Sequence, residues 1–439
     1  MSEMRPKIPH KLGLWSLVAL VVGNAVGAGI YTTSGFSLAD LGSPQWVILA
    51  WFVAGLIALM GALSYGMLAQ GLTESGGEYL YLSRSIHPLA GFIAGWISLL
   101  AGFPGAIAFS ASAFETYLRS AINLDGVTND ILAVGIILFA GMIHIVRVKI
   151  GAKAHESLVL WMIIALFALL TLAVFKFSVS PELPIISEQV VDFSWLAFAN
   201  SLVWISLSYA GFNAVAYVVD EVREPKKNVT RGMVLGTLAT MFLCVSINAV
   251  MLYGVPADLL IGQPDVASIS ANHLGGDLVK KGVEGVIAIS LLTSITAMVL
   301  AGPRVYSKMA EDGALPKVFE GKFGEPPRAS ILLQIVLAIL LVLLSDLQGL
   351  LSYLGLTLSL CLALAVSSLF VRHWRLGERP SSKWYPIAPI VFVSCTVLFA
   401  ILSAIAQPAK LVAVVPTIGL GALAYLVVKR LGDGEKNDV

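Results

Sequence analysis

Twelve long apolar tracts restrict what this sequence can fold into more than any other feature. A helix that crosses the hydrocarbon core of a bilayer needs about 20 predominantly apolar residues, and tracts of about that length recur along the whole chain. They predict helices at 12–35, 45–70, 88–118, 130–147, 155–176, 195–220, 229–254, 283–310, 329–346, 348–371, 385–406 and 409–429. The chain is therefore predicted to be an all-α membrane protein with 12 transmembrane helices.

Composition, residue pattern and net charge exclude three other classes of protein. Of the 439 residues, 57% are hydrophobic and 13% are charged, whereas a soluble domain is about 45–50% apolar and about 25% charged. Strands of a membrane barrel alternate polar and apolar residues over about ten positions, and the tract ILLQIVLAILLVLL at 331–344 does not alternate. A net charge of +1 gives no global field for nucleic acid. A lipid bilayer is the expected environment, and no nucleic-acid partner is expected.

The placement of the basic residues predicts the topology. On one side of the twelve predicted helices lie 23 of the 28 Lys and Arg residues, in the segments 1–11, 71–87, 147–153, 221–231, 304–328, 372–384 and 429–439. Segments facing the cytoplasm carry the excess of positive charge. We therefore expect cytoplasmic tails at 1–11 and 430–439, and a location in the cell inner (plasma) membrane.

Small residues cluster inside two of the predicted helices. The 12–35 helix contains GNAVGAGIY, and the 195–220 helix contains SLSYAGFNAVAY, centred on Gly27 and Gly211. Close helix packing also uses small residues at four-residue spacing. This many glycines, however, lowers helix stability and favours an unwound stretch in the middle of the membrane. We expect both helices to be broken there.

The two clusters lie 184 residues apart, and this offset maps the first five predicted helices onto the next five. Because five is odd, the second copy enters the membrane from the opposite side, which is typical of a 5+5 inverted repeat. The domains are then repeat 1 at 12–176, repeat 2 at 195–371, and two peripheral helices at 385–429. Unwound backbone in a membrane is tolerated where it lines a cavity. Half-helix ends there offer NH groups to a carboxylate and carbonyls to a cation, which suits a zwitterion such as an amino acid.

Four stretches resemble a known family. They are GNAVGAGIY at 23–31, ALSYGMLAQGLTESGGEYLYLSRS at 62–85, SYAGFNAVAYVVDEVREPKKN at 208–228 and GPRVYSKMAEDGALP at 302–316. On these residues the chain is similar to the amino acid–polyamine–organocation (APC) transporters, and most like their L-type amino acid transporter branch. The resemblance implies that the first, second, sixth and seventh helices move as a bundle against a scaffold of the third, fourth, eighth and ninth.

The resemblance also implies a substrate site. The backbone of the first broken helix would hold the α-carboxylate of the substrate at Val26, Gly27, Ala28, Gly29 and Ile30. The second broken helix would hold the α-amine with its carbonyls, and its site residues are Leu207, Ser208, Tyr209, Ala210, Gly211 and Asn213. The aromatic gate of the family falls on Leu207, or its role passes to Tyr209 or Phe212. Asn213 stands where arginine exchangers of the family carry a glutamate. We therefore expect no buried acid in the site, and a neutral amino acid as substrate.

A coupling ion is the one cofactor that the sequence suggests. Met162 stands where proton-coupled and L-type relatives carry a lysine. Sodium symporters that share this fold cage one ion with oxygen atoms at positions that match Gly23, Val26, Ser290, Thr293 and Ser294. Neutral oxygen ligands suit a hard monovalent cation. In the alternative interpretation, the Ser and Thr hydroxyls bond the preceding turn of their own helix. A second sodium site is not expected, because Ile30 falls where a polar ligand would be needed.

Charged residues near the cytoplasmic ends of the helices are predicted to be peripheral. They are Glu74, Glu78, Asp220, Glu221, Arg223, Arg304, Glu311 and Asp312. Two interpretations stay open: solvated interfacial charge, or a cytoplasmic gate that closes by ion pairing when the site is open to the outside.

Enzyme motifs are absent from the sequence. It contains no HExxH, GxSxG or GxxxxGK[ST] motif and no pair of mid-membrane aspartates. The predicted function is secondary active transport of a neutral L-amino acid, or a similar zwitterion, by alternating access with sodium as a coupling ion. The alternatives are a proton-coupled or obligate exchanger, including one for cationic amino acids or polyamines, and a non-transporting membrane sensor. The protein is expected to be a monomer or a homodimer.

Overall fold

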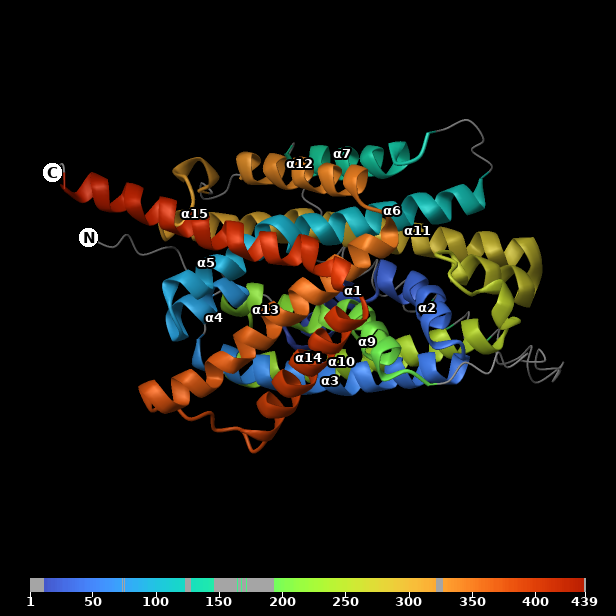
Figure 1. The fold of residues 1–439 in the computed structure, drawn as a ribbon, viewed down its shortest axis with the longest axis horizontal. Helices are drawn as coiled ribbons and strands as arrows, with labels where there is room; N and C mark the ends of the chain where they lie inside the picture. The colour runs from blue at the N-terminus through green and yellow to red at the C-terminus, as the bar shows by residue number, and fades with distance from the viewer. Residues whose placement is uncertain are drawn as a thin grey trace.

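The computed structural model describes residues 12–72, 74, 76–122, 128–145, 164, 167, 171, 193–320 and 327–437. Almost all of these residues lie in helices (Figure 1). The first part of the chain forms α1 (Leu14–Ala25), α2 (Ala28–Leu41), α3 (Pro44–Gly71), α4 (Gly77–Ser85), α5 (Pro88–Ile97), the π-helix η1 (Ser98–Gly102), α6 (Phe103–Ala121) and α7 (Ile131–Ile145). The second part forms α9 (Trp195–Tyr209), the 3₁₀ helices η2 (Ala210–Tyr217) and η3 (Val219–Glu221), α10 (Pro225–Tyr253), α11 (Val266–Glu311), α12 (Arg328–Leu344), α13 (Leu347–Leu376), α14 (Ile387–Ala406), the 3₁₀ turn η6 (Pro408–Lys410) and α15 (Leu411–Asn437).

The described helices are long and apolar enough for a multi-pass membrane protein. Among them, eight could cross a membrane by length and composition, and there are nine if α1 and α2, which bend by 42° at their junction, form one span. Two shorter apolar helices, α7 and α12, have 15 and 17 residues. The predicted helix at 155–176 lies outside the described residues except for Ile164, Phe167 and Thr171. The helical membrane fold is thus confirmed, and the number of twelve spans stays a prediction.

Both predicted interruptions coincide with a change in the backbone. α1 ends at Ala25, Val26 has a non-helical conformation, and α2 begins after the extended Gly27. The second interruption has a different form, because α9 ends at Tyr209 and the chain continues without a sharp bend as the tighter 3₁₀ helix η2. A 3₁₀ segment within a longer helix is common at functional hinges.

Two helical segments lie where the sequence predicted loops. α4 lies within the 71–87 segment, where Gly76 and Gly77 have φ values of 155° and 55° that let the chain turn directly into a helix. α11 begins at Val266 instead of 283 and has a kink at Gly276. Its first half contains many polar residues, so it gave no apolar tract.

The last two helices lie at the periphery of the bundle. Only 28% of the apolar window is buried in α14 and 17% in the span that contains α15, against 67% in α13. A buried polar network nevertheless connects them to the interior. The Lys410 ammonium donates to Asn200 Oδ1 and to Ser403 Oγ and lies 5.0 Å from the centre of the Trp204 ring. Asn200 in turn donates to Asp40 at 2.6 Å, so the network joins α14 and η6 to α9 and to the end of α2.

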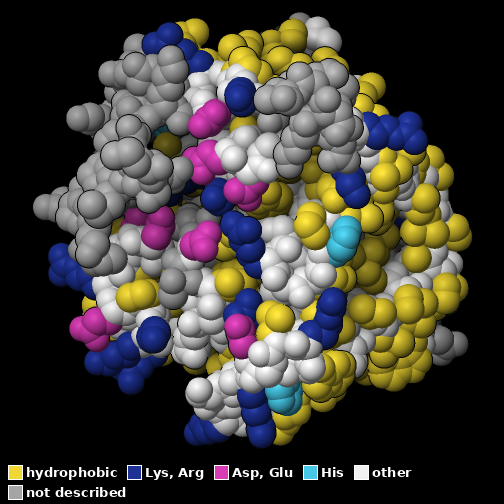
Figure 2. Space-filling model, turned by 90° about the vertical axis from the view of Figure 1, so that its left-hand side faces the viewer, with side chains coloured by type: hydrophobic (Ala, Val, Ile, Leu, Met, Phe, Trp, Pro, Cys, Tyr) yellow, Lys and Arg dark blue, Asp and Glu magenta, His cyan; other side chains and the backbone are white. Residues whose placement is uncertain are grey.

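Charged side chains gather at one end of the molecule. Figure 2 shows the end at which α15 terminates in Figure 1, where basic and acidic side chains are scattered over the face and hydrophobic side chains cover one flank. This distribution is expected when the flank contacts lipid and the end contacts water.

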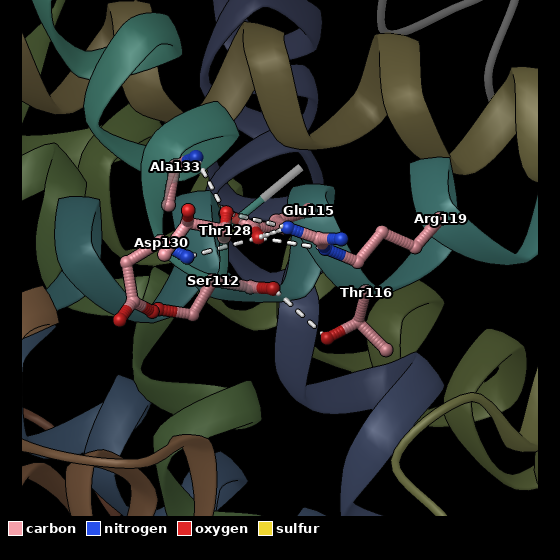
Figure 3. Close-up of polar contacts among 7 residues, drawn as sticks. All are labelled: Ser112, Glu115, Thr116, Arg119, Thr128, Asp130 and Ala133. Atoms are coloured by element: carbon pink, nitrogen blue, oxygen red, sulfur yellow. Dashed lines mark hydrogen bonds and ion pairs between the residues drawn. The ribbon is translucent and has the colours of Figure 1, made fainter. Parts of the chain in front are cut away.

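A buried glutamate fixes the start of α7 (Figure 3). Glu115 on α6 accepts hydrogen bonds from the backbone NH groups of Asp130 at 3.0 Å and Ala133 at 2.9 Å, and it pairs with Arg119 at 2.7 Å. Arg119 also donates to the Thr128 carbonyl at 2.8 Å. The first NH groups of a helix have no partner within the helix. Glu115 therefore serves as the cap of α7 and holds it against α6.

Candidate functional site

A cavity of about 470 Å³ begins at the interruption of the first helix and runs to one end of the bundle. Its deep end is lined by backbone of α2 and η2, and its walls come from α6, α11 and α13. At its mouth lie Leu12, Glu221 and Arg304, and the Arg304 side chain is 47% exposed. The cavity thus connects the two interrupted helices with the surface.

Most of the predicted substrate residues line this cavity. Those that do are Gly27, Ala28, Gly29, Leu207, Ser208, Ala210, Gly211 and Asn213. Three do not line it: Val26 and Ile30 are fully buried, and Tyr209 is 2% exposed with its hydroxyl donating to the Trp51 carbonyl at 3.0 Å.

The backbone gives the deep end of the cavity two opposite polarities. α2 begins here without a side-chain cap, so the NH groups of its first turn, at Ala28, Gly29 and Ile30, have no acceptor within the helix. α9 ends on the other side with the negative end of its dipole. The Ser208 hydroxyl lines the cavity and has no partner among the described residues. This arrangement can hold an anionic group beside α2 and a cationic group beside α9.

The two interrupted helices touch each other at glycines. A Cβ atom added at Gly211 would lie 2.6 Å from the Val21 carbonyl oxygen and 2.7 Å from the Ala25 nitrogen. A Cβ atom added at Gly29 would lie 2.1 Å from Ser208 Oγ. Glycine at these two positions lets α1, α2, α9 and η2 approach closely enough to share one cavity.

No aromatic side chain of α9 faces the cavity. Leu207 lines it, whereas Phe212, the other candidate for the aromatic gate, packs against Tyr65 with ring centres 5.3 Å apart. The Tyr209 hydroxyl is bonded to Trp51, away from the cavity. Of the three candidates for the gate, Leu207 is therefore the one that lines the cavity.

Packed aromatic residues lie beyond the cavity lining, past Gly29 on α2 and Ser110 on α6, on the side hereafter called the closed end. Tyr31 on α2 and Tyr117 on α6 are 1% and 0% exposed, with ring centres 6.4 Å apart in an edge-to-face arrangement. The Tyr117 hydroxyl donates to the Tyr31 carbonyl at 2.8 Å. Phe36 and Trp204 pack in the same manner at 6.3 Å. The site is therefore open at the mouth and sealed at the closed end.

The expectation that the site contains no buried acid is wrong. Glu78, which was predicted to be peripheral, is 3% exposed and lines the cavity. It accepts hydrogen bonds from Tyr65 at 2.8 Å, Asn213 at 3.0 Å and Tyr217 at 2.5 Å. No signal in the sequence marked this burial, which arises because α4 begins at Gly77 and Glu78 lies in its first turn.

The predicted sodium ligands lie at the interruption, but not all of them face it. Ser290 is buried and donates to the Val26 carbonyl at 3.1 Å. Ser294 is also buried, and its oxygen would lie 3.6 Å from a Cβ added at Gly27. Thr293 instead donates to the Ile289 carbonyl of its own helix at 2.8 Å. Gly23 is buried in α1, one turn before the interruption.

Two backbone hydrogen bonds and one ion pair join the segments at the mouth of the cavity. Arg304 on α11 lies 3.1 Å from Glu221 on η3. Leu12 pairs with the same segment by two backbone bonds, to the Glu221 carbonyl at 3.2 Å and from the Arg223 NH at 2.9 Å. The segment before α1 and the end of the second interrupted helix are therefore joined.

A second polar contact joins α4 to the end of α11. Tyr79 on α4 donates to Asp312 at 2.9 Å. Burial raises the pKa of the Tyr79 hydroxyl above its usual range, and the hydrogen bond to Asp312 raises it further. The hydroxyl therefore stays a neutral donor. Asp312 is also 3.4 Å from Lys308. Of the predicted peripheral charges, Glu221, Arg304 and Asp312 are thus paired.

The rest of the lining comes from helices whose facing the sequence could not fix. The walls include Ser98, Gly102, Phe103, Ser110, His144, Thr296, Met298, Leu358, Cys361 and Leu362. Polar residues inside apolar helices, such as Ser98 and Ser110, were the available signal. A uniformly apolar helix, however, has no face that marks the cavity.

Comparison with known proteins agrees with this geometry. The amino acid permease family matches residues 12–425. The large neutral amino acids transporter small subunit 2 of Oryctolagus cuniculus is 25% identical over 90% of this chain and 76% of its own length. The serine/threonine exchanger SteT of Bacillus subtilis is 23% identical over 88% and 89%, and the b(0,+)-type amino acid transporter 1 of Mus musculus is 24% identical over 92% and 84%. The chain therefore belongs to the amino acid permease family of the APC superfamily and is a multi-pass membrane transporter, not an enzyme.

Proposed function

We propose that this protein is a secondary active transporter that moves a neutral L-amino acid, or a similar zwitterion, by alternating access. The observation that carries the proposal is the cavity that joins the first NH groups of α2, which have no acceptor within their helix, to the carbonyl end of α9. A carboxylate beside α2 and an ammonium beside α9 would both be stabilised. The relatives named above as transporters and exchangers of amino acids support the same conclusion.

The proposed architecture has twelve spans. Nine spans, the shorter α7 and α12, and the apolar tract at 155–176 together make twelve. The interruptions at Gly27 and Gly211 support the inverted repeat, with 12–176 and 195–371 as its halves. The positive-inside rule favours cytoplasmic termini in the inner membrane. The mouth would then face the cytoplasm.

A neutral substrate is favoured although Glu78 lines the cavity. A carboxylate has about four acceptor positions, and three of those on Glu78 are occupied by Tyr65, Asn213 and Tyr217. Little of this acid is therefore left to bind a cationic side chain.

Sodium is the proposed coupling ion. The Val26 carbonyl and the hydroxyls of Ser290 and Ser294 gather beside the interruption, and small changes at Gly23 and Thr293 would complete a ring of oxygen ligands. In the present arrangement Ser290 donates to the Val26 carbonyl, so an ion would have to displace this bond. Binding of sodium would thus compete with the contact between α1 and α11.

Reconstitution in liposomes tests the transport proposal. Purified protein is expected to show saturable, stereoselective counterflow of one or more neutral amino acids, with uptake that depends on a sodium gradient. Ser294→Ala and Thr293→Ala are expected to raise the sodium concentration that half-maximal uptake needs. Tight binding without flux would favour a sensor. Flux that ignores sodium and pH gradients would identify an obligate exchanger and reject the sodium site.

The ion pair at the mouth is expected to have a small effect on its own. Exposed pairs contribute about 0.2–1 kcal/mol, and the Arg304 and Glu221 side chains are 47% and 28% exposed. Charge reversal by Glu221→Arg should change the transport rate about two- to fivefold, since two positive charges would repel across the mouth. The exchanged pair Glu221→Arg/Arg304→Glu should restore the rate. A reversal that alters neither the rate nor the accessibility of the cavity would show that the pair has no gating role.

A further inference from the structure

Glu78 is an acid in the cavity wall, and its three hydrogen-bond donors among the described residues are all uncharged. Its side chain is 3% exposed, and its hydrogen bonds come from two phenol hydroxyls and one amide. None of the ion pairs among the described residues includes it. A buried carboxylate that has no cation depends on such donors for the stability of its charge.

Two of the three donors belong to η2, the 3₁₀ segment of the second interrupted helix. Tyr65 is on α3, whereas Asn213 and Tyr217 are both on η2. η2 also provides Ala210 and Gly211 at the deep end of the cavity. A movement of η2 away from Glu78 would therefore break one or both of these bonds.

The protonation state of Glu78 decides how many of these bonds can exist. An ionised carboxylate only accepts, so it matches three donors. A protonated acid must itself donate one bond, and its remaining oxygen positions accept more weakly. The Asn213 NH₂ group can only donate, so one of the two phenols, Tyr65 or Tyr217, would have to reverse its bond or separate. Ionised Glu78 therefore holds η2 more tightly than protonated Glu78 does.

We propose that Glu78 is a proton-binding site whose occupancy is linked to the position of η2. Ionised Glu78 holds η2 in the arrangement described above, and a proton that enters through the cavity releases it. The proposal rests on the transport function proposed above and adds the proton as a second ligand. A proton fits because three of the four acceptor positions are filled, which leaves no coordination shell for a metal ion or ammonium group.

Among the described residues, no other charge is in contact with this acid. The titratable groups that face it are Tyr65 from α3, Tyr81 from α4, Tyr217 from η2 and Cys361 from α13. The neighbouring α5 contains no titratable residue. Arg304 from α11 and Glu221 from η3 line the same cavity and pair with each other.

A movement of η2 would also shift the segments at the mouth of the cavity. η2 leads into η3, and the Glu221 carbonyl and Arg223 NH at its end bond to Leu12, just before α1. Because the docked arrangement needs ionised Glu78, a proton on this carboxylate would loosen it. Proton binding at one carboxylate would thus move the inner ends of both interrupted helices.

The full-length protein in liposomes, with equal pH on both sides, provides the test. Amino acid exchange by the wild type is expected to titrate with one proton, and infrared difference spectra should show the carbonyl stretch of a protonated acid at low pH. Glu78→Gln should exchange at every pH at the rate that the wild type shows at low pH, and should lack the infrared band. Glu115→Gln, which removes a buried glutamate outside the cavity, should keep both the titration and the band.

A second variant keeps the test valid if Glu78→Gln fails to fold. Tyr217→Phe retains the acid but removes one donor to its ionised form, so the midpoint of the exchange profile should move to higher pH. An unchanged midpoint, or a titration and band that persist in Glu78→Gln, would overturn the proposal. Absence of amino acid flux at every pH would instead refute the transport function. The infrared band could still be measured in that case, so the two failures can be distinguished.

Discussion

Replacing Gly211 by alanine is expected to reduce transport by at least about tenfold. The added Cβ would lie 2.6 Å from the Val21 carbonyl oxygen and 2.7 Å from the Ala25 nitrogen. Both are backbone atoms, so η2 and α1 would have to separate. Overpacking of this kind costs about 1–3 kcal/mol, and about 1.4 kcal/mol corresponds to a tenfold change in rate. Initial rates of counterflow in liposomes, corrected for the amount of folded protein, would measure the effect.

Two matched glycine variants separate this contact from a general effect of alanine. Gly419→Ala on the exposed α15 meets nothing within 4 Å and should leave transport unchanged. Gly29→Ala meets the Ser208 hydroxyl, which can rotate, so its effect should be milder and should be relieved by Ser208→Ala. A wild-type rate for Gly211→Ala would mean that the close contact between η2 and α1 is not needed during the cycle.

Truncating Tyr117 is expected to open the closed end of the cavity. Tyr117→Ala removes a fully buried ring and its hydrogen bond to the Tyr31 carbonyl. Loss of a buried aromatic side chain costs about 3–5 kcal/mol, and the part of this loss that is specific to the sealed state shifts the population toward the open one. We expect Thr33→Cys, on α2 and fully buried in the sealed state, to react at least about tenfold faster with an impermeant maleimide applied at the closed end. The labelling experiment should use a protein in which the three native cysteines have been replaced.

A tyrosine near the mouth provides the control for this experiment. Tyr306 is equally buried but packs beside Ser98 and Phe103, so Tyr306→Ala should destabilise the protein without exposing Thr33→Cys. Tyr117→Phe retains the ring and loses one hydrogen bond, worth about 0.5–1.5 kcal/mol, so a smaller rise in labelling is expected. Equal labelling in the Tyr117 and Tyr306 variants would show that Tyr117 does not seal the site.

Local composition is sufficient for some features of the site. The interruption at Gly27 was predictable because glycine weakens a helix wherever the helix lies, and the structure has its break there. The change at Ala210 was predictable for the same reason, although its form was not. Whether a chain bends or tightens into a 3₁₀ helix depends on what packs against it, and at Gly211 that partner is the backbone of α1.

The direction of individual side chains was much less predictable. Tyr209 and Asn213 belong to one motif, yet the first turns away to Trp51 and the second lines the cavity. Thr293 and Ser290 also lie within one turn, and only Ser290 reaches Val26. In helices that are apolar on almost every side, the hydrophobic pattern does not specify rotation about the helix axis. The packing of neighbouring helices specifies it.

Glu78 illustrates this difference most clearly. Its sequence context, a charged residue beside two glycines between apolar tracts, is typical of an exposed loop. Burial became favourable only because Tyr65, Asn213 and Tyr217, which are up to 139 positions away in the sequence, supply three donors at one point in space. The sequence by itself determined that the chain is a helical membrane protein of a transporter family with an interrupted first helix, because these properties follow from local composition and motifs. Only the tertiary structure decided which groups face the cavity, because contacts between distant segments determine whether a buried polar group finds its partners.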